Sequence, residues 1–177
     1  MSADLLPPLP VPKPENQKRG RRSRAKGKAF EDLLDKTFAY YTEKGFAQIE
    51  KTPEPMKVIR SMGQGRFLAC YTKGAQPDYK GTIKGGRTVM FEAKYTDKDR
   101  IDQDRVNEDQ AAYLTQADEL GARCFILAGF QDGGIYRIPW GVWRNMKRIF
   151  GRKYVTEKDL QTYRISRSWN DMLMLIE

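Results

Sequence analysis

The sequence predicts an α/β sandwich in which helices flank a central mixed β-sheet. Three observations support this fold class: an amphipathic helix pattern at residues 25–41, several short strand-like segments after it, and a nearly continuous apolar run at residues 123–130 that follows a second helix pattern. Helices and strands in this order are typical of helices packed on a sheet. With 177 residues and no internal repeat, the chain is expected to form one globular domain.

The first helix is expected over residues 25–41, where apolar side chains recur at helical spacing until Gly45 ends the pattern. Glu31 lies next to this apolar stripe. It is either a surface residue or an acid that reaches toward a functional site, and the sequence slightly favours the surface position.

The segment before this helix, residues 1–26, is rich in proline and in basic residues, and we expect it to lack regular structure in the free protein. The first 28 residues carry a net charge of +6, out of the formal +9 of the chain. This basic run is either a solubilising tail or an arm that neutralises phosphates, and we favour the arm. The cations that we assign to nucleic-acid contact are Lys18, Arg19, Arg21, Arg22, Arg24, Lys26 and Lys28.

Membrane insertion and secretion are not expected. No apolar run is long enough to span a membrane, and prolines interrupt the first fourteen residues, where a signal peptide needs a continuous apolar helix. We therefore expect a soluble cytoplasmic protein with no membrane partner.

Cysteine and histidine usage narrows the chemistry. Cys70 and Cys124 lie far apart, each in an apolar run, and are expected to be reduced thiols in the core. The chain has no histidine, which excludes histidine-based nucleases, Ser or Cys triads and ordinary histidine zinc sites. Any metal must then be held mainly by oxygen, which suits Mg²⁺, Mn²⁺ or Ca²⁺, and Mg²⁺ is the usual ion where phosphate is the substrate.

Residues 46–51 indicate a short strand, and the prolines that follow it prevent regular pairing. Residues 56–59 and 67–71 are candidate strands around a glycine-containing turn. We expect them to form a projecting hairpin, a stalk-like segment at about residues 55–75. Its cations are further candidates for nucleic-acid contact, namely Lys57, Arg60, Arg66 and Lys73.

Residues 88–94 alternate as a half-buried strand does. One face is expected to carry Val89, Phe91 and Ala93, and the other Met90, Glu92 and Lys94. An acid and a base thus point the same way, although a buried charge is costly without a partner, a metal or water. The simple alternative is a surface salt bridge between Glu92 and Lys94.

The turn before this strand decides where Asp78 points. A two-residue loop would place Asp78 opposite Ala93, on the wrong face of the sheet. A three-residue loop, Lys84-Gly85-Gly86, with a glycine in the left-handed region places Asp78 directly opposite Glu92. We predict the three-residue loop, which brings both carboxylates and Lys94 to one site.

Residues 96–105 form a charged segment that we expect to be a loop, too polar to be buried. A helix then begins after Asn107, with Gln110 in register with its apolar stripe. Gln110 either completes a capping box with Asn107 or points an oxygen at the sheet, and the sequence supports the two interpretations about equally.

The apolar run at residues 123–130 indicates a central strand covered on both faces. Residues 135–139 indicate another strand, and residues 140–149 a helix with a basic exposed side. Thr156 is a candidate cap for a short helix that follows it, and residues 169–176 are apolar enough to pack back on the domain.

Pro77-Asp78 followed by Glu92-x-Lys94 on a strand, with no histidine and a basic arm, resembles the PD-(D/E)XK nuclease superfamily. Longer stretches narrow the resemblance to the RecU family of Holliday-junction resolvases, in order and approximate spacing from about residue 27 to residue 139. These stretches are Gly27-Lys28-Ala29-Phe30-Glu31, Lys51-Thr52-Pro53-Glu54-Pro55, Pro77-Asp78-Tyr79-Lys80-Gly81, Phe91-Glu92-Ala93-Lys94-Tyr95-Thr96, Asp109-Gln110 and Cys124-Phe125-Ile126.

The resemblance implies a restriction-endonuclease-like nuclease domain over residues 27–177. Its implied site consists of the metal-binding carboxylates Asp78 and Glu92, the catalytic lysine Lys94, the further metal ligand Gln110, and Glu31 at the edge. Family members carry a threonine two positions before the aspartate, so Gln76 stands where another metal ligand is expected. The segment before Asp78 is a few residues shorter than the family's, which forms a stalk that enters the junction centre.

We therefore expect an endonuclease that resolves four-way DNA junctions in recombination and repair by Mg²⁺-dependent phosphodiester hydrolysis, with Mn²⁺ as a substitute ion. A homodimer with one site per subunit matches the two symmetric strands of a junction. Branched DNA as the substrate implies work at the nucleoid, or in the host cytoplasm if the chain is viral. The alternatives are another PD-(D/E)XK endonuclease that cuts flaps, other branches or restriction-like sites, and a non-catalytic DNA-binding recombination protein.

Overall fold

A central mixed sheet of five strands organises the protein, and the computed structural model describes residues 14–72, 76–168 and 172–176, with side chains from Ala25 onward. In spatial order the strands are β1 (Ala47–Lys51), β4 (Tyr79–Ile83), β5 (Thr88–Thr96), β7 (Arg123–Phe130) and β8 (Ile135–Pro139). Strands β5 and β7 are parallel, and the other neighbours are antiparallel. The predicted α/β sandwich around a mixed sheet is confirmed.

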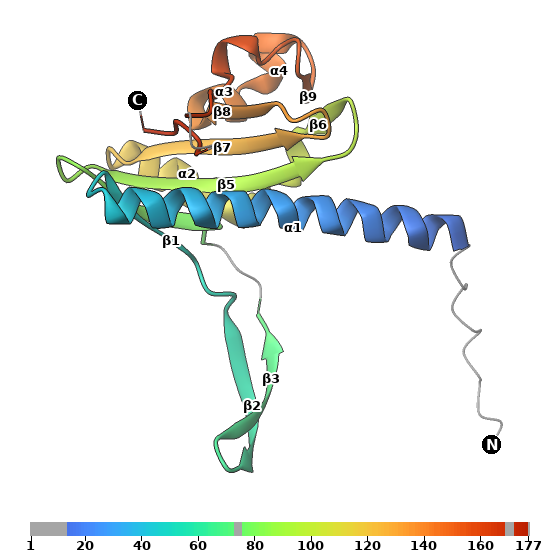
Figure 1. Cartoon of the computed structure of the whole chain (residues 1–177), viewed down its shortest axis with the longest axis vertical. Helices are drawn as coiled ribbons and strands as arrows, with labels where there is room; N and C mark the ends of the chain where they lie inside the picture. Colours follow the sequence, from blue (N-terminus) through green and yellow to red (C-terminus); the bar gives the residue numbers. More distant parts are fainter. Residues whose placement is uncertain (1–13, 73–75, 169–171, 177) are drawn as a thin grey trace.

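Helices cover both faces of this sheet (Figure 1). Helix α1 (Pro14–Glu43) buries an apolar stripe, with Leu34 and Phe38, against one face. The other face is covered by α2 (Glu108–Glu119), α3 (Trp140–Arg144) and α4 (Met146–Phe150). Because β5 and β7 alternate side chains between these two cores, their registers are fixed on both sides. Within the described residues, no helix is both long enough and apolar enough to cross a membrane.

Helix α1 begins earlier than the sequence predicted. We expected its start near residue 25, whereas the helix extends back to Pro14 and includes half of the segment that we expected to lack regular structure. Proline suits the first turn of a helix, where its missing N–H costs nothing, and no other proline lies between it and Glu43. The remaining proline-rich part, residues 1–13, lies outside the described residues.

The β4–β5 hairpin has the predicted three-residue loop. The N–H of Ile83 donates to the carbonyl of Arg87 (3.0 Å), and the N–H of Gly86 donates to the carbonyl of Ile83 (3.0 Å). Gly85 and Gly86 have φ values of 95° and 85°, which residues with a side chain rarely adopt. Tyr79 therefore pairs with Phe91, and the register places Asp78 beside Glu92, as predicted.

A second hairpin, β2 (Met56–Gly63) with β3 (Arg66–Tyr71), projects from the edge of the sheet as predicted, and we call it the stalk hairpin (Figure 1). All of its residues are exposed, including Cys70. The prediction of a core thiol is therefore wrong for Cys70 and right for Cys124, which is buried. The apolar run around Cys70 belongs to a projection, and its sequence resembles that of a core strand.

The charged segment at residues 96–105 is structured, contrary to the prediction of a loop. It contains β6 (Arg100–Asp102), which pairs with β9 (Tyr154–Thr156), and the 3₁₀ turn η1 (Gln103–Arg105). Ile101 is fully buried, because the short strand turns its one large apolar side chain into the core that also holds Val155. Polar neighbours obscured this strand in the sequence.

The C-terminal part differs from the predictions in detail. The helix expected over residues 140–149 is broken at Asn145, whose side chain donates to the carbonyl of Gly141 (2.8 Å). Thr156 ends β9 and donates to Asp159, before the 3₁₀ turn η2 (Gln161–Tyr163). The final segment packs back as predicted, with Leu173 and Leu175 buried against α1.

Candidate active site

Glu92 and Lys94 lie on the face of β5 that is turned toward α2. The Glu92 side chain is completely buried, and that of Lys94 is 14% exposed. Nζ of Lys94 lies 2.6 Å from Oε2 of Glu92. The acid and the base therefore share one face, as the alternation predicted, but in a largely buried pair rather than a surface salt bridge.

Asp78 joins this pair from the start of the hairpin. Its Oδ2 accepts from the backbone N–H of Ala93 (3.0 Å) and lies 3.3 Å from Nζ of Lys94. The ammonium of Lys94 thus bridges both carboxylates. Asp78 is the more open of the two acids, with a side chain that is 34% exposed. Solvent and a substrate therefore reach the pair from the Asp78 side.

The Glu92 carboxyl is in an unfavourable position for a charge. Burial raises its pKa to about 7; the Lys94 ammonium opposes that rise, while the nearby charge of Asp78 adds to it. Oε1 of Glu92 is buried and has no hydrogen-bond partner among the described residues. A buried carboxylate oxygen without a partner costs free energy unless a cation or a proton reaches it.

Gln110 forms the capping box that was one of its two predicted roles, and it also reaches the sheet, but with its amide nitrogen instead of the predicted oxygen. Its Oε1 accepts from the N–H of Asn107 (3.2 Å), and its own N–H donates to Oδ1 of Asn107 (2.9 Å), which completes a capping box at the start of α2. Its Nε2 donates to Oε2 of Glu92 (2.9 Å). The amide nitrogen, not the amide oxygen, therefore faces the carboxylate.

Glu31 and Gln76 lie outside this central cluster. Glu31 is half-exposed on α1 and pairs with Lys51 (2.6 Å), a residue that the sequence analysis did not assign to the site. Lys51 ends β1 opposite Tyr79, and the N–H of the next residue donates to the carbonyl of Asp78, so this ion pair forms the rim of the site. Gln76 is exposed, and its Oε1 accepts from Nζ of Lys80 (3.0 Å).

The central residues suit a hard divalent cation. Among the described residues, no three Asp, Glu, His or Cys side chains form a metal-binding group. Two carboxylates with an unpaired buried oxygen nevertheless match the way Mg²⁺ is held at phosphate sites, where one or two carboxylates bind it and water and phosphate supply the other oxygens. The exposure of Asp78 leaves room for those additional ligands.

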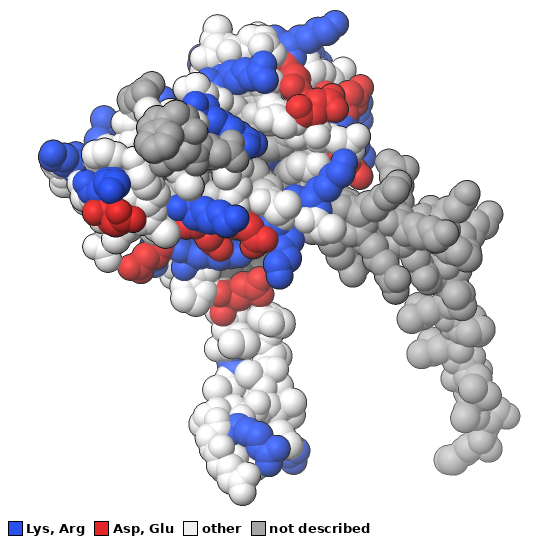
Figure 2. All heavy atoms as spheres, in the orientation of Figure 1, with Lys and Arg blue, Asp and Glu red and all other residues white. Residues whose placement is uncertain are grey.

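The cations assigned to nucleic-acid contact lie on two projections. Lys57, Arg60 and Arg66 are exposed on the stalk hairpin, and Lys26 and Lys28 are exposed on α1. The segment that carries Lys18, Arg19, Arg21, Arg22 and Arg24 is described only as helical backbone, and Lys73 lies outside the described residues. Figure 2 shows blue Lys and Arg side chains near the tip of the otherwise mostly white stalk hairpin, whereas Lys57, which pairs with Cys70, lies nearer its base.

The chain is similar in sequence to proteins of one family. The family model described as "RecU: Recombination protein U" matches residues 25–174. A Holliday junction resolvase RecU of Geobacillus sp. (strain WCH70) is 26% identical over 148 residues, which cover 78% of this chain and 73% of the relative. A protein with the same description from Geobacillus kaustophilus is 27% identical, with 78% and 74% covered. Among solved structures, Archaeoglobus fulgidus Hjc, a Holliday junction resolvase, overlaps 65% of this chain and 78% of its own, with 16% identity and a TM-score of 0.41.

Proposed function

The chain belongs to the RecU family, and we propose that it is an endonuclease that resolves four-way DNA junctions by metal-dependent hydrolysis of phosphodiester bonds. The observation that supports this proposal most is the meeting of Asp78, Glu92 and Lys94 at one half-buried site, with Oε1 of Glu92 unpaired. A purely structural ion pair does not need a second carboxylate, and it leaves no buried oxygen without a partner.

In the proposed mechanism, Asp78 and Glu92 hold the ion. Bound Mg²⁺, or Mn²⁺ in its place, supplies charge neutralisation at the phosphate and lowers the pKa of a bound water. Gln110 keeps Oε2 of Glu92 engaged through Nε2, which leaves Oε1 available. Ligation by the Gln110 oxygen requires the amide to turn and break the capping box, so we assign Gln110 to holding Glu92.

Lys94 supplies the second part of the chemistry. Its ammonium lies between the two carboxylates, where it balances their charge in the absence of a divalent ion. We propose that Nζ turns toward the substrate when an ion binds and stabilises the negative charge that develops on the phosphate oxygens. Because the side chain is mostly buried, this positive charge acts with little screening by water.

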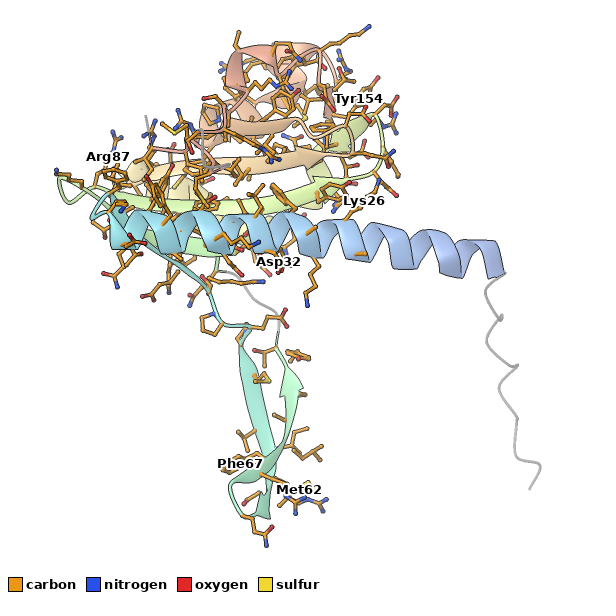
Figure 3. The ribbon with its side chains drawn as sticks, viewed as in Figure 1. Lys26, Asp32, Met62, Phe67, Arg87 and Tyr154 are labelled. Carbon is orange, nitrogen blue, oxygen red and sulfur yellow. The ribbon has the colours of Figure 1, made fainter. Side chains whose placement is uncertain are left out.

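The stalk hairpin and a homodimer complete the proposal. Exposed apolar side chains on a projecting hairpin are suited to the unstacked bases at the centre of a junction, and two copies of the chain place one site on each of two symmetric strands. Figure 3 shows Met62 and Phe67 near the tip of the hairpin, away from every other element. Since DNA is the proposed substrate, we propose that the protein acts in the cytoplasm, at the nucleoid, or in the host cytoplasm if the chain is viral.

The function is tested with labelled four-way, Y-shaped and linear DNA of equal length, each with and without Mg²⁺. We expect paired cuts in the four-way junction with Mg²⁺ only, and a loss of roughly 10³-fold or more in Glu92→Ala with binding retained. Preferred cutting of the Y-shaped or linear DNA indicates another endonuclease. Tight binding without any cutting indicates a non-catalytic recombination protein, and full activity of Glu92→Ala removes the assigned site.

A further inference from the structure

Outside the N-terminal segment and the stalk hairpin, positive charge is concentrated in the C-terminal lobe of residues 139–164. This lobe carries seven Lys or Arg against two Asp or Glu, a net charge of +5. The first 28 residues carry +6 and the whole chain carries +9. The residues that belong neither to this segment nor to the lobe therefore carry a net charge of −2. The body of the sheet is therefore slightly acidic, and it lies between two basic regions.

Four cations of the lobe are free to contact a ligand. Arg144, Lys147 and Arg148 are spaced at i, i+3 and i+4 and are all exposed, while the neighbouring Trp143 and Met146 are buried. Lys153 is exposed beyond the turn at Gly151. None of these four cations forms a salt bridge with a described residue. Figure 2 shows Lys and Arg side chains over the upper lobe.

The lobe presents these charges from a rigid support. The Tyr154 ring is contacted by the guanidinium groups of Arg100, 4.6 Å from its centroid, and Arg152, 4.9 Å from its centroid. Arg152 also pairs with Asp159 at 2.6 Å. These two arginines are therefore occupied in fastening β6 to β9. The backbone next to Lys153 is therefore fastened to the rest of the domain.

The lobe lies next to the active site, across the start of α2. A hollow of about 830 Å³ is lined by Arg144 and Lys153 on one side and by Asn107 on the other, and Asn107 caps the helix through Gln110, which contacts Glu92. The hollow and Glu92 are thus linked through the first turn of α2. The hollow itself also holds Asp102, Asp104 and Glu108, so its acidic wall directs phosphates to the outer rim of the lobe.

We propose that Arg144, Lys147, Arg148 and Lys153 form a second DNA-binding surface, which contacts the sugar-phosphate backbone of a duplex arm of the junction. Exposed cations without acidic partners are the footprint of a phosphate backbone, and they read no base sequence. The inference rests on the proposed function only for the nature of the DNA. The surface acts beside the cut strand and takes no part in the chemistry.

The test compares two variants of the full-length protein with equal charge loss. The lobe variant carries Arg144→Gln, Lys147→Gln and Arg148→Gln, and the control carries Lys36→Gln, Lys84→Gln and Arg87→Gln, which are exposed on α1 and the β4–β5 hairpin. Binding to a four-way junction with arms of two helical turns is measured over a range of NaCl concentrations without Mg²⁺. We expect the lobe variant to bind roughly 10- to 100-fold more weakly near 0.1 M salt, with a salt slope smaller by about 2 to 3.

The control is expected to change the slope by less than about 1. Equal salt slopes for the two variants overturn the inference, as does a lobe variant that binds the junction as tightly as the wild type. Cutting is scored separately on the wild type. If the wild type cuts no junction and the lobe variant still binds the junction more weakly, the inference stands and the proposed function is wrong.

Discussion

The two β-hairpins of this chain have opposite characters. In the β4–β5 hairpin, Tyr79 and Phe91 are fully buried with ring centroids 5.1 Å apart, and Phe91 stacks in turn on Phe125 at 4.6 Å. In the stalk hairpin every residue is exposed, although seven of them are large and apolar. One hairpin is held by a core, and the other is held only by its own backbone pairing.

The difference shows how burial positions chemistry. A slip of one residue in β5 would turn Phe91 away from its core and Glu92 into the aromatic layer under α1, so the packing that buries the aromatic rings also aims the carboxylate. The stalk hairpin has no buried face, and its pairing shifts between Val58 and Arg60 and between Ser61 and Gly63. Its exposed apolar side chains are therefore suited to contact a binding partner, and they do not stabilise the core.

The largest expected difference between the two hairpins is in the stability lost when a phenylalanine in each is replaced by alanine. We expect Phe91→Ala to lower the free energy of unfolding by about 3–5 kcal/mol, because it leaves a cavity between two stacked rings. Phe67→Ala, at a side chain that is 59% exposed, should change it by less than about 0.5 kcal/mol. Urea unfolding measures both. Similar losses would mean that the stalk hairpin is packed in solution.

The next largest effect is the pH dependence of stability that is caused by Glu92, the buried acid on the β4–β5 hairpin. The pKa of Glu92 is raised from 4.5 to about 7, so the folded protein binds this proton more tightly than the unfolded chain. The stabilisation of the folded protein by this bound proton is complete below pH 4.5, and it is lost as the pH rises through about 7. Without metal, Glu92→Gln should avoid this loss, which is on the order of 3 kcal/mol.

Thermal unfolding at pH 5 and pH 8 with a chelator checks this prediction. The advantage of Glu92→Gln over the wild type should grow with pH, and saturating Mg²⁺ should reduce it by stabilising the wild type. Asp32→Asn, at an exposed position on α1, is the control and should show no such trend. A pH-independent difference would refute the unfavourable burial of the Glu92 charge.

A smaller effect is expected for DNA binding by the stalk hairpin. Phe67→Ala and Tyr71→Ala should each weaken binding to a four-way junction about tenfold, since stacking on a base contributes about 1–3 kcal/mol. Binding to linear duplex should be unchanged. Leu120→Ala removes an even more exposed apolar side chain from the end of α2 and is the control. If linear and branched DNA respond alike, the stalk hairpin does not read the branch.

The smallest change is a difference in labelling between the two thiols. Burial raises the pKa of Cys124 to about 12, so its thiolate is scarce at pH 8, whereas Cys70 is exposed on β3. A thiol reagent should label Cys70 quickly and Cys124 only after unfolding, and bound junction DNA should protect Cys70. Counting labelled cysteines with and without denaturant tests this. Rapid labelling of both thiols would contradict the folded core around Cys124.

Short-range patterns carried most of the correct predictions. The alternation in β5 and the Gly85-Gly86 pair were enough to place Asp78 beside Glu92, because both signals depend only on neighbouring residues. The capping box between Asn107 and Gln110 is local in the same way. The contact from Gln110 to Glu92 was left open, since it depends on how α2 lies on the sheet.

The wrong or missed predictions concern features that depend on contacts between residues far apart in the sequence. An apolar run looks alike in a core strand and in the stalk hairpin, so the exposure of Cys70 was missed. Ile101 is a lone apolar residue among charges, and only its pairing partner Val155, far along the chain, makes it part of a strand. The ion pair of Glu31 with Lys51 likewise requires α1 to lie over the end of β1.

The central claim is that Asp78 and Glu92 share a divalent ion. Calorimetric titration of Mn²⁺ into the wild type, Asp78→Asn and Glu92→Gln tests it most directly, because it does not depend on the substrate. We predict binding by the wild type and a loss of tenfold or more, about 1.4 kcal/mol, in each variant. Equal Mn²⁺ affinity for all three proteins would contradict the account.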